Sequence, residues 1–212
     1  MRPLAVDWFG DRAVVVRMAD PRVRWALVTA LGDEFGQNRV RAGMESVLVE
    51  STEPDAHLRD RVAQWLAEVV VDSGVAGPST STIEIPVVYD GEDLNMAAAA
   101  LGCDVATLVA AHSAQQWSVA MMGFAPGFGY LVPFGDSLLP WAQVPRLDRP
   151  RPRVPRGSVG MAAGMSAVYP APMPGGWLLL GTTEVTMFDP DNEEEPTLLR
   201  PGSQVRFVEA DV

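Results

Sequence analysis

Five arginines gathered in one proline-rich stretch are the residues of this sequence best suited to bind an anion. The stretch PRLDRPRPRVPRGSVG (145–160) carries Arg146, Arg149, Arg151, Arg153 and Arg156. Its four prolines exclude a helix, so it must run extended along a surface or a sheet edge. In an extended chain Arg149, Arg151 and Arg153 project to one side as exposed side chains, where guanidinium groups can hold a carboxylate or a phosphate. An edge strand kept soluble by its charges is the alternative interpretation.

Two glycine-rich and aromatic segments flank this stretch, GFAPGFGYL (123–131) and AVYPAPMPGGWLLLG (167–181). In the first, Phe124, Phe128 and Tyr130 alternate with small residues, as they do on a strand or tight loop beside a pocket. The glycines allow positive φ angles or a close approach of the backbone. We therefore expect residues 123–181 to form a binding site.

The overall composition excludes several classes of function. The 212 residues carry a formal net charge of −11, which argues against a nucleic-acid-binding surface. All sixteen basic residues are arginine, so a phosphate-loop lysine, a Schiff base and a lysine general base are excluded. No apolar run is long enough for a membrane span, and Asp7 and Asp11 interrupt the N-terminal segment where a signal peptide needs its apolar core. We expect a cytoplasmic protein without a membrane partner.

The sequence offers no persuasive nucleophile and no metal-binding motif. Cys103 is the single cysteine, and His57 and His112 are the only histidines, so no clustered zinc ligands are predicted. Ser158 lies in RGSVG rather than in a nucleophile elbow, and only His112 could act as its base. His112 ends a predicted helix, where the helix dipole favours its protonated form, so it is either a proton donor or a helix cap.

The order of predicted elements indicates an α+β protein in two parts. The first part contains a strand after the Gly10 turn, a helix over 21–37, a strand over 44–50 and a helix over 54–71. The segment SGVAGPSTST (73–82) is the predicted boundary, which divides the chain into 1–78 and 79–212.

In the second part we expect a strand over 82–91 and helices over 92–101 and 104–113, with Asp104 as a cap. Strands then follow over 116–122, 177–190 and 203–209. Short strands and Gly/Pro turns of this kind favour a sandwich or a barrel.

Several of these motifs, read in order, resemble one bacterial family. They are IPVVYDG, the helix-ending His112, GFAPGFGYL, the arginine stretch, YP, PGGW and FDP. The sequence resembles the B subunit of prokaryotic 5-oxoprolinase, also described as allophanate hydrolase subunit 1 and related to the sporulation kinase A inhibitor. The resemblance is specific over 84–208 and weaker before it. It implies a small N-terminal α/β lobe followed by a cyclophilin-like β-barrel domain.

The resemblance also implies an activity and partners. The activity is the ATP-dependent opening of 5-oxo-L-proline to L-glutamate, with ATP acting at the level of the complex and no metal assigned to this chain. The implied partners are the A subunit and a homologous C subunit, which is similar to allophanate hydrolase subunit 2. An allophanate hydrolase or urea carboxylase subunit and a noncatalytic histidine kinase inhibitor are the alternatives.

Site residues follow from the same motif matches. The candidate catalytic residues are His112, Arg151 and Arg153. The candidate substrate-binding residues are Phe124, Tyr130, Arg146, Ser158, Met165, Tyr169 and Trp177.

Two positions depart from the family pattern. Met165 stands where the family usually has a glutamine before its Tyr-Pro pair, and Gly129 stands where the family often has proline. The first change replaces an amide that can orient a substrate by a thioether.

Overall fold

The computed structural model describes residues 5–17, 24–68 and 82–211. The chain divides into two compact units, Met1–Gly77 and Pro78–Val212. The predicted boundary segment at 73–82 lies almost entirely outside the described residues, as does the start of the first predicted helix. Each unit is therefore described by itself.

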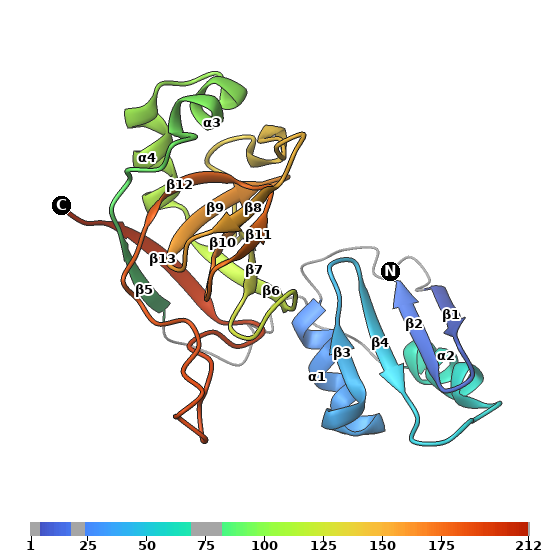
Figure 1. The fold of residues 1–212 in the computed structure, drawn as a ribbon. Coiled ribbons are helices and arrows are strands. Elements are labelled where there is room, and N and C mark those ends of the chain that lie inside the picture. The colour runs from blue at the N-terminus through green and yellow to red at the C-terminus, as the bar shows by residue number, and fades with distance from the viewer. Residues whose placement is uncertain (1–4, 18–23, 69–81, 212) are drawn as a thin grey trace. The chain divides into compact units, whose positions relative to one another are not determined.

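The N-terminal unit is a four-stranded antiparallel sheet in the order β1-β2-β4-β3, with two helices (Figure 1). The strands are β1 (Ala5–Phe9), β2 (Ala13–Arg17), β3 (Val40–Ala42) and β4 (Ser46–Glu50). The helices are α1 (Arg24–Phe35) and α2 (Leu58–Glu68), and a short 3-10 helix, η2 (Gln37–Arg39), follows α1. The sequence analysis missed β3, which is only three residues long.

Alternating valines explain why this sheet forms a core on one face. Val14 and Val16 of β2 and Val47 and Val49 of β4 are fully buried, because residues two apart on a strand share a face. The apolar stripes of both helices pack into the same cluster.

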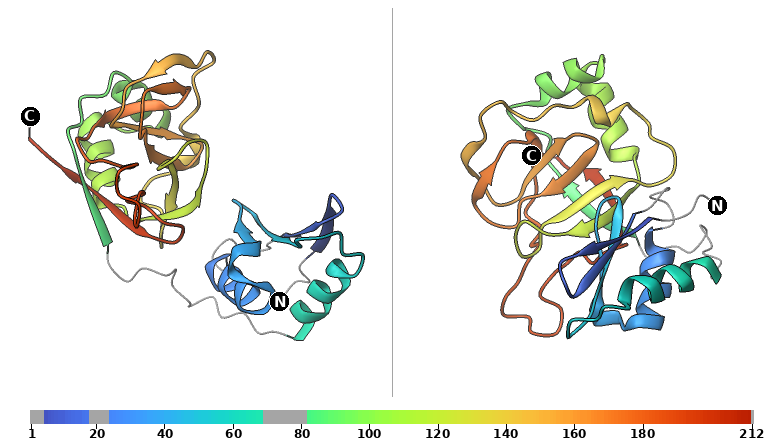
Figure 2. Two further views of the ribbon diagram at one scale, coloured as in Figure 1. Left: turned by 60° about the horizontal axis from the view of Figure 1, so that its bottom comes forward. Right: turned by 90° about the vertical axis from the view of Figure 1, so that its right-hand side faces the viewer.

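The C-terminal unit is built on a seven-stranded sheet that curls into a barrel in the order β12-β9-β10-β7-β6-β13-β5 (Figures 1 and 2). Its strands are β5 (Thr82–Val87), β6 (Trp117–Met122), β7 (Gly129–Pro133), β9 (Ser158–Ala162), β10 (Met165–Val168), β12 (Leu178–Thr182) and β13 (Gln204–Glu209). A separate two-stranded ribbon pairs β8 (Arg151–Val154) with β11 (Met173–Gly175). The helices are α3 (Leu94–Leu101) and α4 (Val105–Ala114), and η3 (Trp141–Gln143) is a short 3-10 helix. The predicted α+β class with a β-barrel is confirmed.

Two glycines let the first and last strands of the sheet meet. Val88 and Thr182 exchange backbone hydrogen bonds of 2.9 and 2.8 Å, which join the end of β5 to β12. A side chain on Gly181 would collide with the Val88 carbonyl, and one on Gly91 would collide with the backbone of β12. Glycine at both positions therefore permits the closure.

The predicted cap is present, and one predicted strand is shorter than expected. Asp104 accepts a 2.7 Å hydrogen bond from the Thr107 N–H and caps α4. The strand expected over 177–190 runs only from Leu178 to Thr182.

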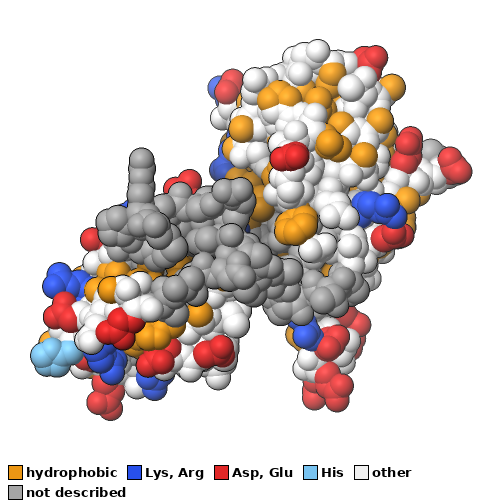
Figure 3. Space-filling view, turned by 180° about the vertical axis from the view of Figure 1, so that it is seen from behind, with side chains coloured by type: hydrophobic (Ala, Val, Ile, Leu, Met, Phe, Trp, Pro, Cys, Tyr) orange, Lys and Arg blue, Asp and Glu red, His pale blue; other side chains and the backbone are white. Residues whose placement is uncertain are grey.

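An acidic segment projects from the barrel between β12 and β13 (Figures 1 and 3). The base of this segment is held by a bridge between Phe188 and Thr197. Glu193, Glu194 and Glu195 are exposed, which agrees with a solvated loop.

In the described part of the chain, no single helix is both long and apolar enough to cross a membrane. Helices α3 and α4 meet that criterion only when taken together, across a bend of 85°.

Candidate functional site

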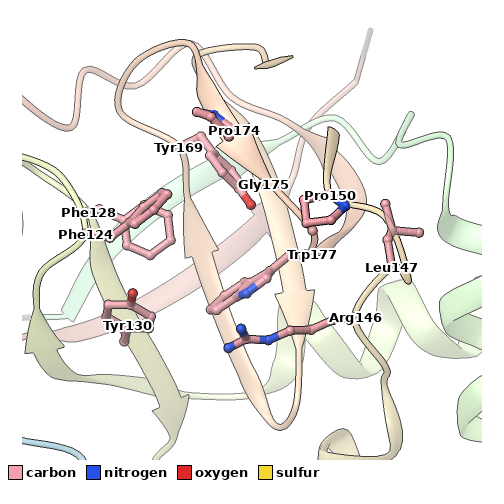
Figure 4. A pocket seen from close by; sticks show the side chains of 11 residues that line it. Phe124, Phe128, Tyr130, Arg146, Leu147, Pro150, Tyr169, Pro174, Gly175 and Trp177 are labelled. Carbon is pink, nitrogen blue, oxygen red and sulfur yellow. The ribbon is translucent and has the colours of Figure 1, made fainter. Parts of the chain in front are cut away.

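A cavity of about 310 Å³ opens on the barrel domain beside β7 and the β8–β11 ribbon (Figure 4). Four segments far apart in the sequence contribute to its wall. They are β7 with the loop before it, the chain that leads into β8, the residue after β10, and β11 with the turn that follows it. The lining residues are Phe124, Phe128, Tyr130, Arg146, Leu147, Pro150, Tyr169, Pro174, Gly175, Gly176 and Trp177.

The loop before β7 places Phe124 at the rim of the cavity. The Ala125 N–H bonds back to the Gly123 carbonyl at 2.9 Å, and Phe124 between them has a φ of 72°. This is a γ-turn in the strained form that few side chains adopt. The ring of Phe124 is 62% exposed.

Five aromatic rings, Phe124, Phe128, Tyr130, Tyr169 and Trp177, form an aromatic cluster with Phe128 at its centre. The Phe128 ring lies 5.1 to 5.9 Å from the other four, always edge to face. Pairs of this kind contribute about 0.5–1.5 kcal/mol each beyond their burial. The cluster therefore gives the cavity a rigid apolar wall.

Glycines make room for Tyr169 and Trp177 of the cluster. A Cβ on Gly160 of β9 would lie 3.0 Å from the Tyr169 ring and 3.3 Å from the Trp177 Cβ, and a side chain on Gly175 would overlap the Tyr169 hydroxyl. The rings consequently lie flat against the backbone, with Tyr169 1% and Trp177 6% exposed.

Arg146 supplies the cationic group of the cavity. Its guanidinium extends alongside Trp177 (Figure 4). The segment is tied down by a 2.7 Å hydrogen bond from the Leu147 N–H to the Gly176 carbonyl. Among the residues that the structure describes, no carboxylate forms an ion pair with Arg146, so this cation is available to a ligand.

Arg151 has a different environment from the one that the sequence predicted. Its guanidinium binds both carboxylate oxygens of Asp93 at 2.7 and 2.9 Å and one of Glu92 at 2.8 Å. Asp93 is buried and also accepts a 2.8 Å bond from the Leu179 N–H. The prediction of an exposed Arg151 directed at an anion is therefore wrong, because the side chain is used to hold β8 against the start of α3.

The remaining candidates on and near the arginine stretch lie outside the cavity lining. Arg149 and Arg153 are exposed, and Ser158 is buried on β9. Met165 is half-buried and packs against the aromatic cluster rather than facing the cavity.

His112 is fully buried and does not line the cavity. Its ring stacks on Phe207 with centroids 4.5 Å apart. Burial lowers the pKa of His112 to about 3. The prediction that the helix dipole favours the protonated imidazole is therefore wrong, because desolvation of the charged ring outweighs the dipole.

A directional chain of hydrogen bonds fixes the tautomer of His112. Ser166 Oγ donates its single proton to the Gly160 carbonyl at 3.2 Å, so it must accept from His112 Nε2–H at 3.0 Å. His112 Nδ1 then accepts the Tyr89 hydroxyl proton at 2.8 Å. The chain joins α4 to β10 and β9 inside the barrel.

Among the described residues that line the cavity, the polar side-chain groups are the hydroxyls of Tyr130 and Tyr169, the indole N–H of Trp177 and the guanidinium of Arg146. None of the lining residues is a His, Cys, Ser, Asp or Glu. The cavity can therefore bind a flat apolar ligand that carries an anionic group, but it lacks a base that works near neutral pH.

The structure brings together five of the predicted substrate-binding residues: Phe124, Tyr130, Arg146, Tyr169 and Trp177. The sequence analysis missed the contributions of Leu147 and Pro174. The Pro-Gly-Gly run before Trp177 could have predicted these contributions, because adjacent glycines indicate a close approach of the backbone.

Residues 4–199 match the carboxyltransferase domain family, subdomain C and D. The chain belongs to this family. A relative from Escherichia coli O157:H7, named as the B subunit of 5-oxoprolinase, is 37% identical over 211 residues, which cover 94% of this chain and 93% of the relative. A Bacillus subtilis relative of the same name is 39% identical over 158 residues, 73% of this chain and 62% of the relative. The family resemblance predicted from the sequence is confirmed.

Solved structures extend the comparison to longer chains of similar fold. The crystal structure of TTHA0988 has a TM-score of 0.70 at 32% identity and covers 95% of this chain, which spans only 40% of that protein. The K. lactis urea amidolyase has a TM-score of 0.74 at 18% identity, and this chain spans 15% of it. At that identity the likeness shows the fold alone.

Proposed function

We propose that this chain is the B subunit of an ATP-dependent 5-oxoprolinase, which opens the lactam of 5-oxo-L-proline to L-glutamate. The main observation behind the proposal is that Arg146, which has no ion-pair partner among the described residues, lies beside the aromatic cluster. The chain is also 37% identical to a protein named as that subunit. A five-membered lactam is flat enough to lie against Trp177, and its carboxylate suits the guanidinium of Arg146.

Partner subunits are part of the proposal because the cavity itself lacks a general base. The chemistry needs a water molecule to be activated and the lactam carbonyl to be phosphorylated or otherwise polarised. We assign these steps to the A and C subunits, and we place ATP at the level of the complex. TTHA0988 supports a larger assembly, since this chain spans only 40% of that protein.

The proposal is tested by expressing the chain with its genomic neighbours and measuring ATP hydrolysis with 5-oxo-L-proline and with allophanate. We expect hydrolysis that depends on 5-oxo-L-proline and on all subunits, together with co-elution of the subunits on size exclusion. Dependence on allophanate instead would identify an allophanate-type enzyme. Dependence on neither substrate would favour a binding protein.

The isolated chain is expected to turn over neither ATP nor lactam. Repeated purification should leave no activity above that of a blank preparation. Robust turnover by the chain alone would show that a catalytic group has been overlooked in it.

A further inference from the structure

The hydroxyl of Tyr169 is a buried polar group of the cavity whose role the family match leaves open. The tyrosine ring is only 1% exposed, yet the residue lines the cavity. Its hydroxyl end is directed toward Gly175 and Trp177 (Figure 4). A tyrosine hydroxyl buried in a protein normally has a hydrogen-bond partner.

Burial raises the pKa of the Tyr169 hydroxyl, whereas the Trp177 N–H and the positive charges of Arg151 and Arg146 lower it. The hydroxyl is therefore protonated near neutral pH.

A phenolic hydroxyl has one proton to donate and an oxygen that accepts. In the described part of the chain, no carboxylate or carbonyl accepts a hydrogen bond from the Tyr169 hydroxyl, and this hydroxyl is not among the fully enclosed polar atoms that lack a partner. Its proton is thus left to an acceptor that enters the cavity.

Arg146 and Tyr169 together present a guanidinium fork and a neutral hydroxyl donor to the same cavity. This pair matches a ligand that carries a carboxylate and a carbonyl oxygen on one small ring. We propose that the Tyr169 hydroxyl donates a hydrogen bond to the ring carbonyl of the bound lactam, while Arg146 pairs with the carboxylate. This inference rests on the proposed function. It assigns the specificity of the cavity for a lactam to Tyr169.

Three small ligands separate the two contacts. The first, 5-oxo-L-proline, has both groups, cyclopentanecarboxylate lacks the ring carbonyl, and 2-pyrrolidinone lacks the carboxylate. Their dissociation constants are measured by ligand-observed NMR titration with the full chain and with the co-expressed complex. The variants are Tyr169→Phe and Arg146→Gln, with Tyr89→Phe as the matched control, since it removes a tyrosine hydroxyl that bonds to His112 outside the cavity.

Tyr169→Phe should weaken binding of 5-oxo-L-proline and 2-pyrrolidinone by roughly three- to tenfold, the effect of one neutral hydrogen bond, and leave cyclopentanecarboxylate unchanged. Arg146→Gln should weaken the two carboxylates and spare 2-pyrrolidinone. Tyr89→Phe should preserve the order of affinities even if it lowers the melting temperature.

Different failures have different meanings. Equal losses of all three ligands in Tyr169→Phe, a loss confined to the two carboxylates, or no loss would overturn the assignment of Tyr169. A selective loss in Tyr130→Phe, with Tyr169→Phe unaffected, would overturn it as well. If 5-oxo-L-proline binds neither the chain nor the complex, the proposed substrate is wrong, and the role of Tyr169 is rejected with it.

Discussion

The buried imidazole of His112 makes the stability of the barrel domain depend on pH. Its pKa is about 3 in the folded protein, below the value of about 6.5 in an unfolded chain. The unfolded state therefore binds the proton more tightly, and the stabilising contribution, complete above pH 6.5, is lost as the pH falls toward 3. The full difference is on the order of 5 kcal/mol, as an upper limit.

We expect His112→Gln to lower the stability at pH 7 and to flatten its decrease between pH 6.5 and 4, because the group that titrates is gone. Urea denaturation at several pH values gives both quantities. His57→Gln is the matched control, since His57 is exposed. If the wild type and His112→Gln lose stability in parallel as the pH falls, the imidazole is not buried in its neutral form.

At the scale of elements, a partly buried ion pair helps to attach the β8–β11 ribbon to the barrel. Arg151 on β8 binds Asp93 at the start of α3, and Asp93 also bonds to the Leu179 N–H of β12. Three elements therefore meet at one carboxylate. The chain on either side of the ribbon carries cavity residues, among them Arg146 and Trp177, so this attachment fixes one wall of the cavity.

Removing Arg151 should leave the Asp93 carboxylate buried and without its cation. We expect Arg151→Met to lower the free energy of unfolding by about 3–5 kcal/mol, whereas Arg153→Met, on the same strand but exposed, should change it by less than about 0.5 kcal/mol. Adding Asp93→Asn to Arg151→Met should recover part of the loss. Equal denaturation midpoints for the two single variants would show that the ion pair contributes nothing.

The α-helices and several strands of the fold follow from sequence patterns, because alternation and helical periodicity are local properties, whereas the choice of a barrel over a sandwich came from the family resemblance. The apolar stripe of Leu58 and Val62 predicts α2, and Asp104 predicts the start of α4. The role of Arg151 could not be predicted in this way. Asp93 is 58 residues away in the sequence, and only the folded barrel places the two side chains together.

Part of the site could also be predicted, because some of its features are local sequence patterns. Aromatic residues beside glycines indicate a pocket wall, and Phe124 and Trp177 do line the cavity. The sequence could not separate Arg146 from Arg151, because the two share the same local composition and differ only in the neighbours that the fold provides. The neutral state of His112 could not be predicted either, because its burial against Phe207, from the last strand of the barrel, is a long-range property.

At the scale of the whole molecule, the described cavity fits a binding subunit better than a complete enzyme. It holds an anion-binding arginine and aromatic walls without a group that activates water. Under the proposed function, the chain acts in an assembly in which this cavity positions the lactam and partner subunits supply the reaction.

The most direct test of the proposed function is the release of L-glutamate from 5-oxo-L-proline by the co-expressed complex, measured with the wild-type chain and with Arg146→Gln. A charge-assisted hydrogen bond contributes about 1.5–3 kcal/mol, so we predict that kcat/KM falls by about one to two powers of ten, mainly through KM. Arg153→Gln, an exposed arginine outside the cavity, is the matched control and should behave as the wild type. An assembled Arg146→Gln complex with wild-type kcat/KM would contradict the claim that this cavity binds the substrate.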